Sequence, residues 1–392
     1  MLVRSDGDHY RFRHQLLHEF YVARYIHGLL TAGDGAIDKI WGEREVWQRS
    51  GWIQPFLLLV EFQQEDAIKL LDILLDVQPE AAAAEWEHLR LTSSTLIDDQ
   101  IAERVKERLT ARMLPPEMST EFPRLEAAYG RALGRMRMPD GSPMDKRSGV
   151  WGHYSKQTNR TNIDIEWIKV CAGKFYFQGQ ESSIRRSFHI SKFPITYSQY
   201  MAFVEDPGGW DNPKWRGRFS GRSFRREYRP TKRINNSPCT EVSLYMAEAF
   251  CRWLSSHMQC AVRLPTEEEW ERAASGTTGR QFPWGTDAEG MCNSYQELDD
   301  TSAVGIFQDA LSEEGVMDLS GNVREWTSTR YCFGHRGNLS RIVSLALWPI
   351  VPACRWFASR GGSWMTHRFH CSSSSCDWYL PDEETIISDF EL

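Results

Sequence analysis

Apolar positions recur at helical spacing through the first third of the chain. The stretches DAIKLLDILLDV (66–77) and IAERVKERLTARML (101–114) repeat the 3.6-residue pattern that one face of a helix requires. The same spacing assigns one face of an earlier helix to Leu16, Phe20, Ala23 and Leu30. Residues 1–137 are therefore predicted to form a helical domain.

Residues 138–163 interrupt this pattern. The stretch MPDGSPMDKRSGVWGHYSKQTNRTN has few apolar residues and many Gly, Pro, Ser and Asn residues, which favour turns. Such a composition is typical of a connection between folded units. We therefore predict a linker at 138–163.

Short β-like runs and two helices follow the predicted linker. Ser243 is placed to cap the first helix, and Thr266 with Glu269 has the spacing of a capping box, which satisfies two backbone donors at a helix start. Many Gly and Trp residues separate these elements. Residues 164–392 are predicted to form an α+β domain with long loops. Apolar spacing turns these residues of the first helix inward: Ala247, Phe250, Cys251, Leu254 and Met258.

Composition and charge argue against two classes of function, general nucleic-acid binding and insertion into a membrane. The chain has 392 residues, of which 41% are hydrophobic and 25% charged, as in an ordinary globular protein. Its formal net charge of -7 argues against nucleic-acid binding through the whole surface, because such binding requires neutralisation of phosphates. The longest apolar stretch, WIQPFLLLVEF, is too short to cross a bilayer, and the N-terminus has no signal-peptide pattern. We expect a cytoplasmic protein without a membrane partner.

One segment, Lys214–Arg233, is strongly basic. It contains nine basic residues and one acid, interleaved with aromatic residues, which is a pattern that can bind an anion or a nucleic-acid strand. The alternative is a solvated insertion loop whose aromatic side chains pack onto the domain. The acidic balance of the whole chain favours the loop, so nucleic acid is not expected as a partner.

Several common catalytic and metal-binding patterns are absent from the sequence. The chain has no phosphate-binding G-x-x-x-x-G-K-[ST] loop, no G-x-S-x-G elbow and no H-E-x-x-H pair. Its nine cysteines are scattered without a C-x-x-C pair, which indicates reduced thiols. His367, His370, Cys371 and Cys376 match no ordinary zinc spacing, so no metal site is predicted.

Seven ordered stretches from about residue 164 onward carry a family resemblance. They read IEWIKVCAGKFYFQG, FHISKFPITYSQYMAFVE, SPCTEVSLYMAEAFCRWL, VRLPTEEEWERAA, FPWG, GVMDLSGNVREWTS and RGGSW. Together they resemble the formylglycine-generating enzyme (sulfatase-modifying factor) family, which implies a variant of the C-type lectin fold. Gly321 and Asn322 are predicted to form a turn with positive φ, and Trp326 to anchor the core.

Active members of that family oxidise a substrate cysteine with copper held between two cysteines. The resemblance places these ligands at Thr366 and Cys371. A threonine hydroxyl cannot replace the soft thiolate that Cu(I) prefers, so we predict neither a catalytic site nor copper. The alternative is a copper-dependent formylglycine-generating oxidase in which Cys376 supplies the second thiolate. Its catalytic residues would then be Cys371, Ser363 and Cys376.

The C-terminal tail also resembles the variable region of diversity-generating retroelement variable proteins. There a G-G-S-W framework precedes freely mutated surface positions, and Pro381 and Phe390 stand at matching distances after Gly362. The resemblance predicts a variable binding site for a protein or other macromolecular ligand, with rigid aromatic anchors beside adaptable polar groups. Its residues are Met365, Thr366, His367, Phe369, His370, Ser372, Ser373, Ser374, Ser375, Asp377, Trp378, Tyr379, Leu380, Glu383, Thr385, Ile386 and Ile387.

The N-terminal stretch YRFRHQLLHEFYVARYI carries a shorter resemblance, to the far end of NACHT-type STAND ATPases. It implies that residues 1–137 are the end of such an ATPase and that the recognition domain is the sensor end of a signalling protein. The alternative is an amphipathic core helix on which His14 and His18 are merely solvated.

Calcium is a further structural option that the family resemblance raises. Asp318, Asn322 and Glu325, with backbone carbonyls, offer the hard oxygen ligands that Ca2+ prefers. An ordinary turn network of the same residues is the alternative. No calcium site is predicted.

Overall fold

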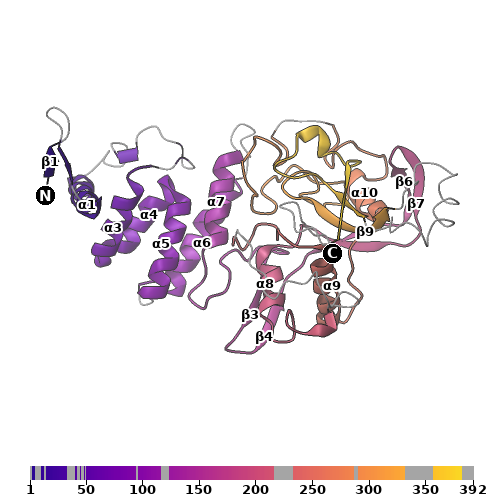
Figure 1. Cartoon of the computed structure of the whole chain (residues 1–392), viewed down its shortest axis with the longest axis horizontal. Coiled ribbons are helices and arrows are strands. Elements are labelled where there is room, and N and C mark those ends of the chain that lie inside the picture. The colour runs from indigo at the N-terminus through magenta and orange to yellow at the C-terminus, as the bar shows by residue number, and fades with distance from the viewer. Residues whose placement is uncertain are drawn as a thin grey trace.

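The chain folds into a helical N-terminal region, residues 15–135, followed by an α+β domain, as predicted. The computed structural model describes residues 2–4, 10–12, 15–32, 40–41, 45, 48, 50–93, 96–115, 123–215, 233–286, 290–331 and 356–381. Figure 1 shows the helices at one end of the molecule and the mixed domain at the other. Among the described residues, no helix is both long enough and apolar enough to span a membrane.

The helical region begins after a short antiparallel pair of strands, β1 and β2. The patterns at 66–77 and 101–114 correspond to α4 and α6, which confirms both predictions. Asp98 starts α6 because its side chain accepts a hydrogen bond from Ile101 N at 2.8 Å. The elements are β1 (Leu2–Arg4), β2 (Tyr10–Phe12), α1 (Gln15–Ala32), α3 (Ile53–Phe62), the 3-10 helix η1 (Gln64–Asp66), α4 (Ala67–Val77), α5 (Pro79–Thr92), α6 (Asp99–Met113) and α7 (Pro123–Arg135).

The predicted inward face of α1 is wrong at one position. Leu16 is 73% exposed, whereas Ala23 and Ile26 are buried. Phe20 packs edge to face against Phe62 of α3, with ring centroids 5.7 Å apart. Leu16 lies one turn before Phe20, in the first turn of α1.

The described residues of the α+β domain form small antiparallel sheets and the helices α8, α9 and α10. Its sheets pair β3 with β4, β5 with β8 and β6 with β7, and a three-stranded sheet has the order β11-β10-β9. The elements are β3 (Gly152–Ser155), β4 (Arg160–Ile163), β5 (Trp167–Val170), β6 (Gly173–Phe177), β7 (Gln180–Ile184), β8 (Phe188–Ser191), α8 (Tyr197–Glu205), α9 (Leu244–Met258), α10 (Glu267–Ser275), β9 (Glu325–Tyr331), β10 (Trp356–Arg360), the 3-10 helix η3 (Arg368–His370) and β11 (Cys376–Tyr379).

Both predicted helix starts in this domain are confirmed. The Ser243 side chain accepts from Met246 N at the start of α9, and Thr266 and Glu269 form a complete capping box on α10. Most predicted inward residues of α9 are buried, but Met258 is 39% exposed. It is the last residue of α9, and Gln259 then turns the chain through a left-handed conformation.

The segment predicted as a linker is largely folded. Residues 138–163 contain the β3–β4 hairpin, and Asp145 within them is buried. Arg147 donates to both Asp145 carboxylate oxygens, at 3.0 and 2.9 Å, and to Val304 O at 3.0 Å. Polar residues are abundant here because they bond to one another and to backbone groups inside the fold.

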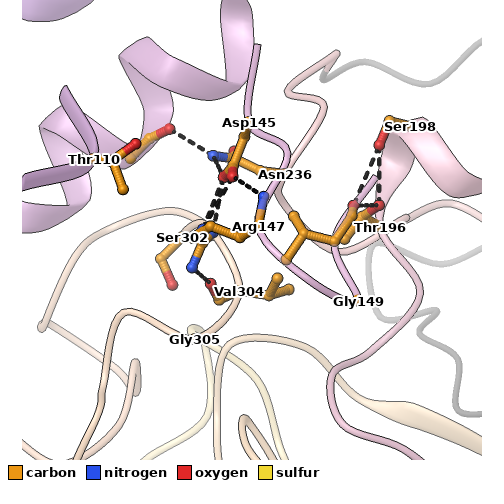
Figure 2. A network of polar contacts seen from close by, with 12 residues as sticks. Thr110, Asp145, Arg147, Gly149, Thr196, Ser198, Asn236, Ser302, Val304 and Gly305 are labelled. Atoms are coloured by element: carbon orange, nitrogen blue, oxygen red, sulfur yellow. Dashed lines mark hydrogen bonds and ion pairs between the residues drawn. The ribbon is translucent and has the colours of Figure 1, made fainter. Parts of the chain in front are cut away.

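Asn236 joins the helical region to the α+β domain. Its amide Nδ2 donates to Gly130 O on α7 at 3.0 Å and to Asp145 Oδ2 at 2.8 Å. Figure 2 shows Asn236, Arg147 and Asp145 converging at this junction. Burial raises the pKa of Asp145, but the Arg147 charge and the hydrogen bonds outweigh burial and keep the pKa below its ordinary value. Asp145 is therefore a charged carboxylate in the folded protein at neutral pH.

Candidate functional site

The predicted recognition segment begins at a turn that requires glycine. Gly361 and Gly362 follow β10 with φ of 87° and 72°. A Cβ on Gly362 would lie 2.6 Å from Cys371 Sγ. Both the backbone conformation and the close approach therefore favour glycine. The turn brings the next residues over the sheet, where Trp364 N donates to Asn322 O at 3.0 Å.

Arg324 gathers three of the predicted binding residues. Its Nη2 donates to Thr366 Oγ1 at 3.1 Å, and its Nη1 pairs with the carboxylate of Asp377. The guanidinium also lies over the Tyr379 ring, 5.7 Å from the centroid. Residues from the turn and from β11 are thus held around one largely buried cation. The local sequence gave no signal for Arg324.

Thr366 has a structural role at the position where the family resemblance expects a copper ligand. Its Oγ1 lies 3.1 Å from Ser363 Oγ and accepts from Ser363 N at 3.1 Å, in addition to Arg324. Its carbonyl accepts from Tyr295 N at 2.9 Å. The hydroxyl is therefore engaged on several sides within the turn.

Cys371 is present but is a poor thiolate. Its side chain is fully buried, and Sγ lies 3.7 Å from Thr366 O and 3.9 Å from His367 O. Burial raises the pKa of this thiol to about 12, although the Arg324 charge acts in the opposite direction. Cys371 is thus a protonated thiol at neutral pH in the metal-free protein.

Cys376, the second thiolate of the oxidase alternative, is a free cysteine. It lies in β11 in register with Arg360, and burial beside Glu267 raises its pKa to about 12. Glu267, Arg360 and Asp377 interact with Cys376, whereas Arg324 and the backbone of Ser363 and Gly321 interact with Cys371. Cys371 is therefore fully buried, whereas Cys376 is partly exposed and lies in different surroundings.

The exposed part of the segment combines apolar and polar side chains. Met365 is 54% exposed and Phe369 is 56% exposed. The His367 and Phe369 rings stack with centroids 5.2 Å apart. Tyr295, at 56% exposure, adjoins them through its bond to Thr366 and was not predicted from the sequence. Of the other predicted residues, His370, Ser374 and Asp377 are exposed, and Thr366, Ser375, Trp378, Tyr379 and Leu380 are partly exposed.

Ser372 and Ser373 lie inside the domain rather than on its surface. The fully buried Arg360 donates to Ser373 O at 3.0 Å and Ser374 O at 3.3 Å, while pairing with Glu267 at 3.2 Å and with Glu271. Gln178 adds a bond to Ser374 O at 2.9 Å. The backbone of the serine run, residues 372–375, is thereby held by Arg360 and Gln178.

Some predicted residues lie outside the described part of the chain. They are Glu383, Thr385, Ile386 and Ile387 of the binding segment, and residues 216–232 of the basic segment. Lys214, at the edge of the basic segment, stacks on the buried Trp215, with Nζ 4.5 Å from the ring centroid.

The suggested calcium ligands bond within the protein. Asp318 accepts from Gly305 N at 2.7 Å, Asn322 accepts from Ser302 N at 3.0 Å, and Glu325 accepts from Trp270 Nε1 at 2.8 Å. The turn predicted at 321–322 has positive φ, and Trp326 is buried, which confirms both predictions. Within the described ranges, no group of three or more His, Cys, Asp and Glu side chains could hold a metal ion.

Fold and site together define a protein with a helical N-terminal region and an α+β domain that fixes a glycine-rich C-terminal turn. The sequence profile of the sulfatase-modifying factor enzyme 1-like domain matches residues 154–390. The chain therefore belongs to this family.

Three similar proteins illustrate the match. Hercynine oxygenase of Mycolicibacterium smegmatis is 26% identical over 234 residues, which cover 53% of this chain and 52% of that protein. Formylglycine-generating enzyme of Mus musculus is 27% identical over 279 residues, 66% of each chain. The solved Treponema denticola variable protein 1 has 19% identity and a TM-score of 0.43, covering 59% of this chain and 95% of that one. The chain thus spans about half the length of the hercynine oxygenase it matches.

Proposed function

We propose that this chain is a non-catalytic recognition protein of the sulfatase-modifying factor family. The observation that carries the proposal is Thr366, whose hydroxyl bonds to Ser363 and Arg324 where active relatives would need a thiolate. Cys371 beside it is buried with its pKa raised to about 12. A threonine hydroxyl cannot replace the thiolate that Cu(I) prefers, so Cys371 lacks a second soft ligand at this position.

The same turn supports a binding role. Met365, His367 and Phe369 project from a segment whose backbone is fixed by Arg324, Arg360 and the glycine pair. A fixed backbone reduces the entropy that a surface loses on binding. Large exposed side chains beside Ser374 and Asp377 suit a macromolecular ligand, such as a protein, which aromatic anchors and polar groups bind together.

We further propose that this surface is diversified by a retroelement and that the domain is the sensor end of a STAND signalling protein. The tail resemblance supports the first, and the stretch YRFRHQLLHEFYVARYI supports the second. The exposed free thiols of Cys171 and Cys260 support a reducing compartment such as the cytoplasm. The coding DNA tests diversification directly: a neighbouring reverse transcriptase and a near-repeat differing only at adenines are expected.

Copper binding tests the non-catalytic part of the proposal. We expect no tight Cu(I) complex in a competition titration with bicinchoninate, and no oxygen uptake with a cysteine-containing peptide. Thr366→Cys provides a positive control because it restores the second soft ligand. Copper bound by the unmodified protein and lost in Cys371→Ser would overturn the proposal.

Affinity purification tests the recognition part. A partner retained by the native protein from its own cell lysate should be lost with the double variant Met365→Ser and Phe369→Ala, and kept with Leu91→Ser. Leu91 is 73% exposed on α5 and serves as a matched surface control. Removal of an aromatic anchor typically weakens binding at least tenfold. Equal recovery of the partner with the native protein, the double variant and Leu91→Ser would contradict the proposed binding surface.

A further inference from the structure

A cavity lies beside the β5–β8 sheet, and none of its lining residues belongs to the C-terminal turn. It has a volume of about 460 Å³. The lining residues are Trp167, Phe188, His189, Ile190, Met258, Cys260, Ala261, Val262, Arg263, Pro265 and Glu269. Its walls are mostly apolar, with Met258, Ala261, Val262 and Pro265 on the side facing the strands. A volume of this size is ordinary for a small-molecule site.

The wall opposite the strands is held in place by hydrogen bonds. Ser255 Oγ accepts from Val262 N at 2.8 Å and donates to Val262 O at 3.0 Å. Pro265 O accepts from Ser328 N at 2.8 Å, and Gln259 ends α9 in a left-handed conformation that directs the chain along the cavity. The cavity is therefore formed before any ligand arrives.

The charges at the rim neutralise each other. Arg263 donates through Nη1 and Nη2 to the two carboxylate oxygens of Glu269, at 2.7 and 2.6 Å, and its Nη1 also donates to Leu264 O. In a bidentate pair of this kind, the carboxylate already balances the guanidinium charge that would attract an anion. Charge complementarity thus favours a neutral ligand.

We propose that this cavity is a binding site for a neutral, largely apolar small molecule. Apolar walls supply affinity by removing ligand surface from water, and the Arg263–Glu269 pair leaves no net charge between these two lining residues. The site is separate from the proposed recognition surface and does not depend on it. Cys260, an exposed free thiol on the wall, provides a reporter at the cavity.

Two dyes with one scaffold test the proposal. N-phenyl-1-naphthylamine is neutral and apolar, and 8-anilinonaphthalene-1-sulfonate is its sulfonated, anionic counterpart. The full chain should bind the neutral dye saturably, with one equivalent per chain, and bind the sulfonate at least about tenfold more weakly, because a desolvated anion would find no free partner. Equal affinity for both dyes would refute the neutral-ligand assignment.

Variants at Ala261 locate the bound dye. Ala261 is exposed, so Ala261→Trp should fill the cavity without unfolding the domain, and Ala261→Ser is the matched control. We expect binding lost in the Trp variant and retained in the Ser variant, with N-ethylmaleimide labelling of Cys260 slowed by the dye only in the latter. Unchanged binding in a folded Ala261→Trp protein, or no saturable binding by the native chain, would overturn the proposal.

Discussion

Asp318 shows how one residue can set a pH dependence. Its carboxylate is buried, and burial raises the pKa to about 6 although Gly305 N donates to it at 2.7 Å. Because the folded pKa is raised above 3.8, the protonated carboxyl stabilises the fold at low pH, and this contribution is lost as the pH rises towards 6. The residue also has a φ of 59°, which asparagine tolerates well.

Asp318→Asn is therefore expected to stabilise the protein at pH 7 and to have little effect below pH 4. The gain at pH 7 is about 3 kcal/mol in the free energy of unfolding, because the variant no longer buries a charge and a pKa raised from 3.8 to about 6 costs roughly 1.4 kcal/mol per pKa unit. Urea denaturation at both pH values measures it. Asp299→Asn is the matched control, since Asp299 has a φ of 58° and a side chain that is 72% exposed. A destabilised Asp318→Asn protein at pH 7 would contradict this account.

At the scale of elements, β10 and α10 are joined by a buried cation. Arg360 at the end of β10 pairs with Glu267 and Glu271 of α10, and its side chain is fully buried. Its bonds to Ser373 O and Ser374 O extend the network to the segment before β11. A helix, a strand and the serine run are thus held by one guanidinium.

Arg360→Met should cost about 3 kcal/mol in the free energy of unfolding, because two buried carboxylates lose their shared partner. Chemical denaturation followed by tryptophan fluorescence measures the loss. Lys174→Met removes an exposed ion pair with Glu181 and should leave the midpoint unchanged. If Arg360→Met unfolded at the native midpoint, the ion pairs would not stabilise this sheet.

Helix caps could be predicted from the sequence, whereas the two arginine networks could not. Thr266 and Glu269 are three residues apart, so their reciprocal bonds follow from local spacing. Arg324 meets Thr366 and Arg360 meets Glu271 across 42 and 89 positions of the chain. Apolar periodicity carries no information about such polar contacts. The exposed turn at 365–370 could be anticipated only through family resemblance.

At the scale of the whole molecule, the composition of residues 138–163 did not predict that the helical region and the α+β domain are joined by a folded segment. Polar residues at 138–163 suggested a linker, but Asp145 and Arg147 are bonded inside the fold. Asn236 then connects Asp145 to Gly130 of α7. A polar, close-packed junction of this kind should transmit strain from α7 to the α+β domain.

Two glycine variants test whether α7 is packed closely against the α+β domain. A Cβ on Gly134 would lie 2.0 Å from Asn236 Oδ1 and 2.6 Å from Ile234 Cγ2, whereas a Cβ on Gly28 of α1 meets nothing within 4 Å. Alanine favours helices over glycine by up to about 1 kcal/mol, so Gly28→Ala should stabilise the protein. Gly134→Ala should instead destabilise it by about 2 kcal/mol, because the crowding outweighs helix propensity. Urea unfolding monitored by circular dichroism compares the two, and a gain for both would show that α7 is not tightly packed at Asn236.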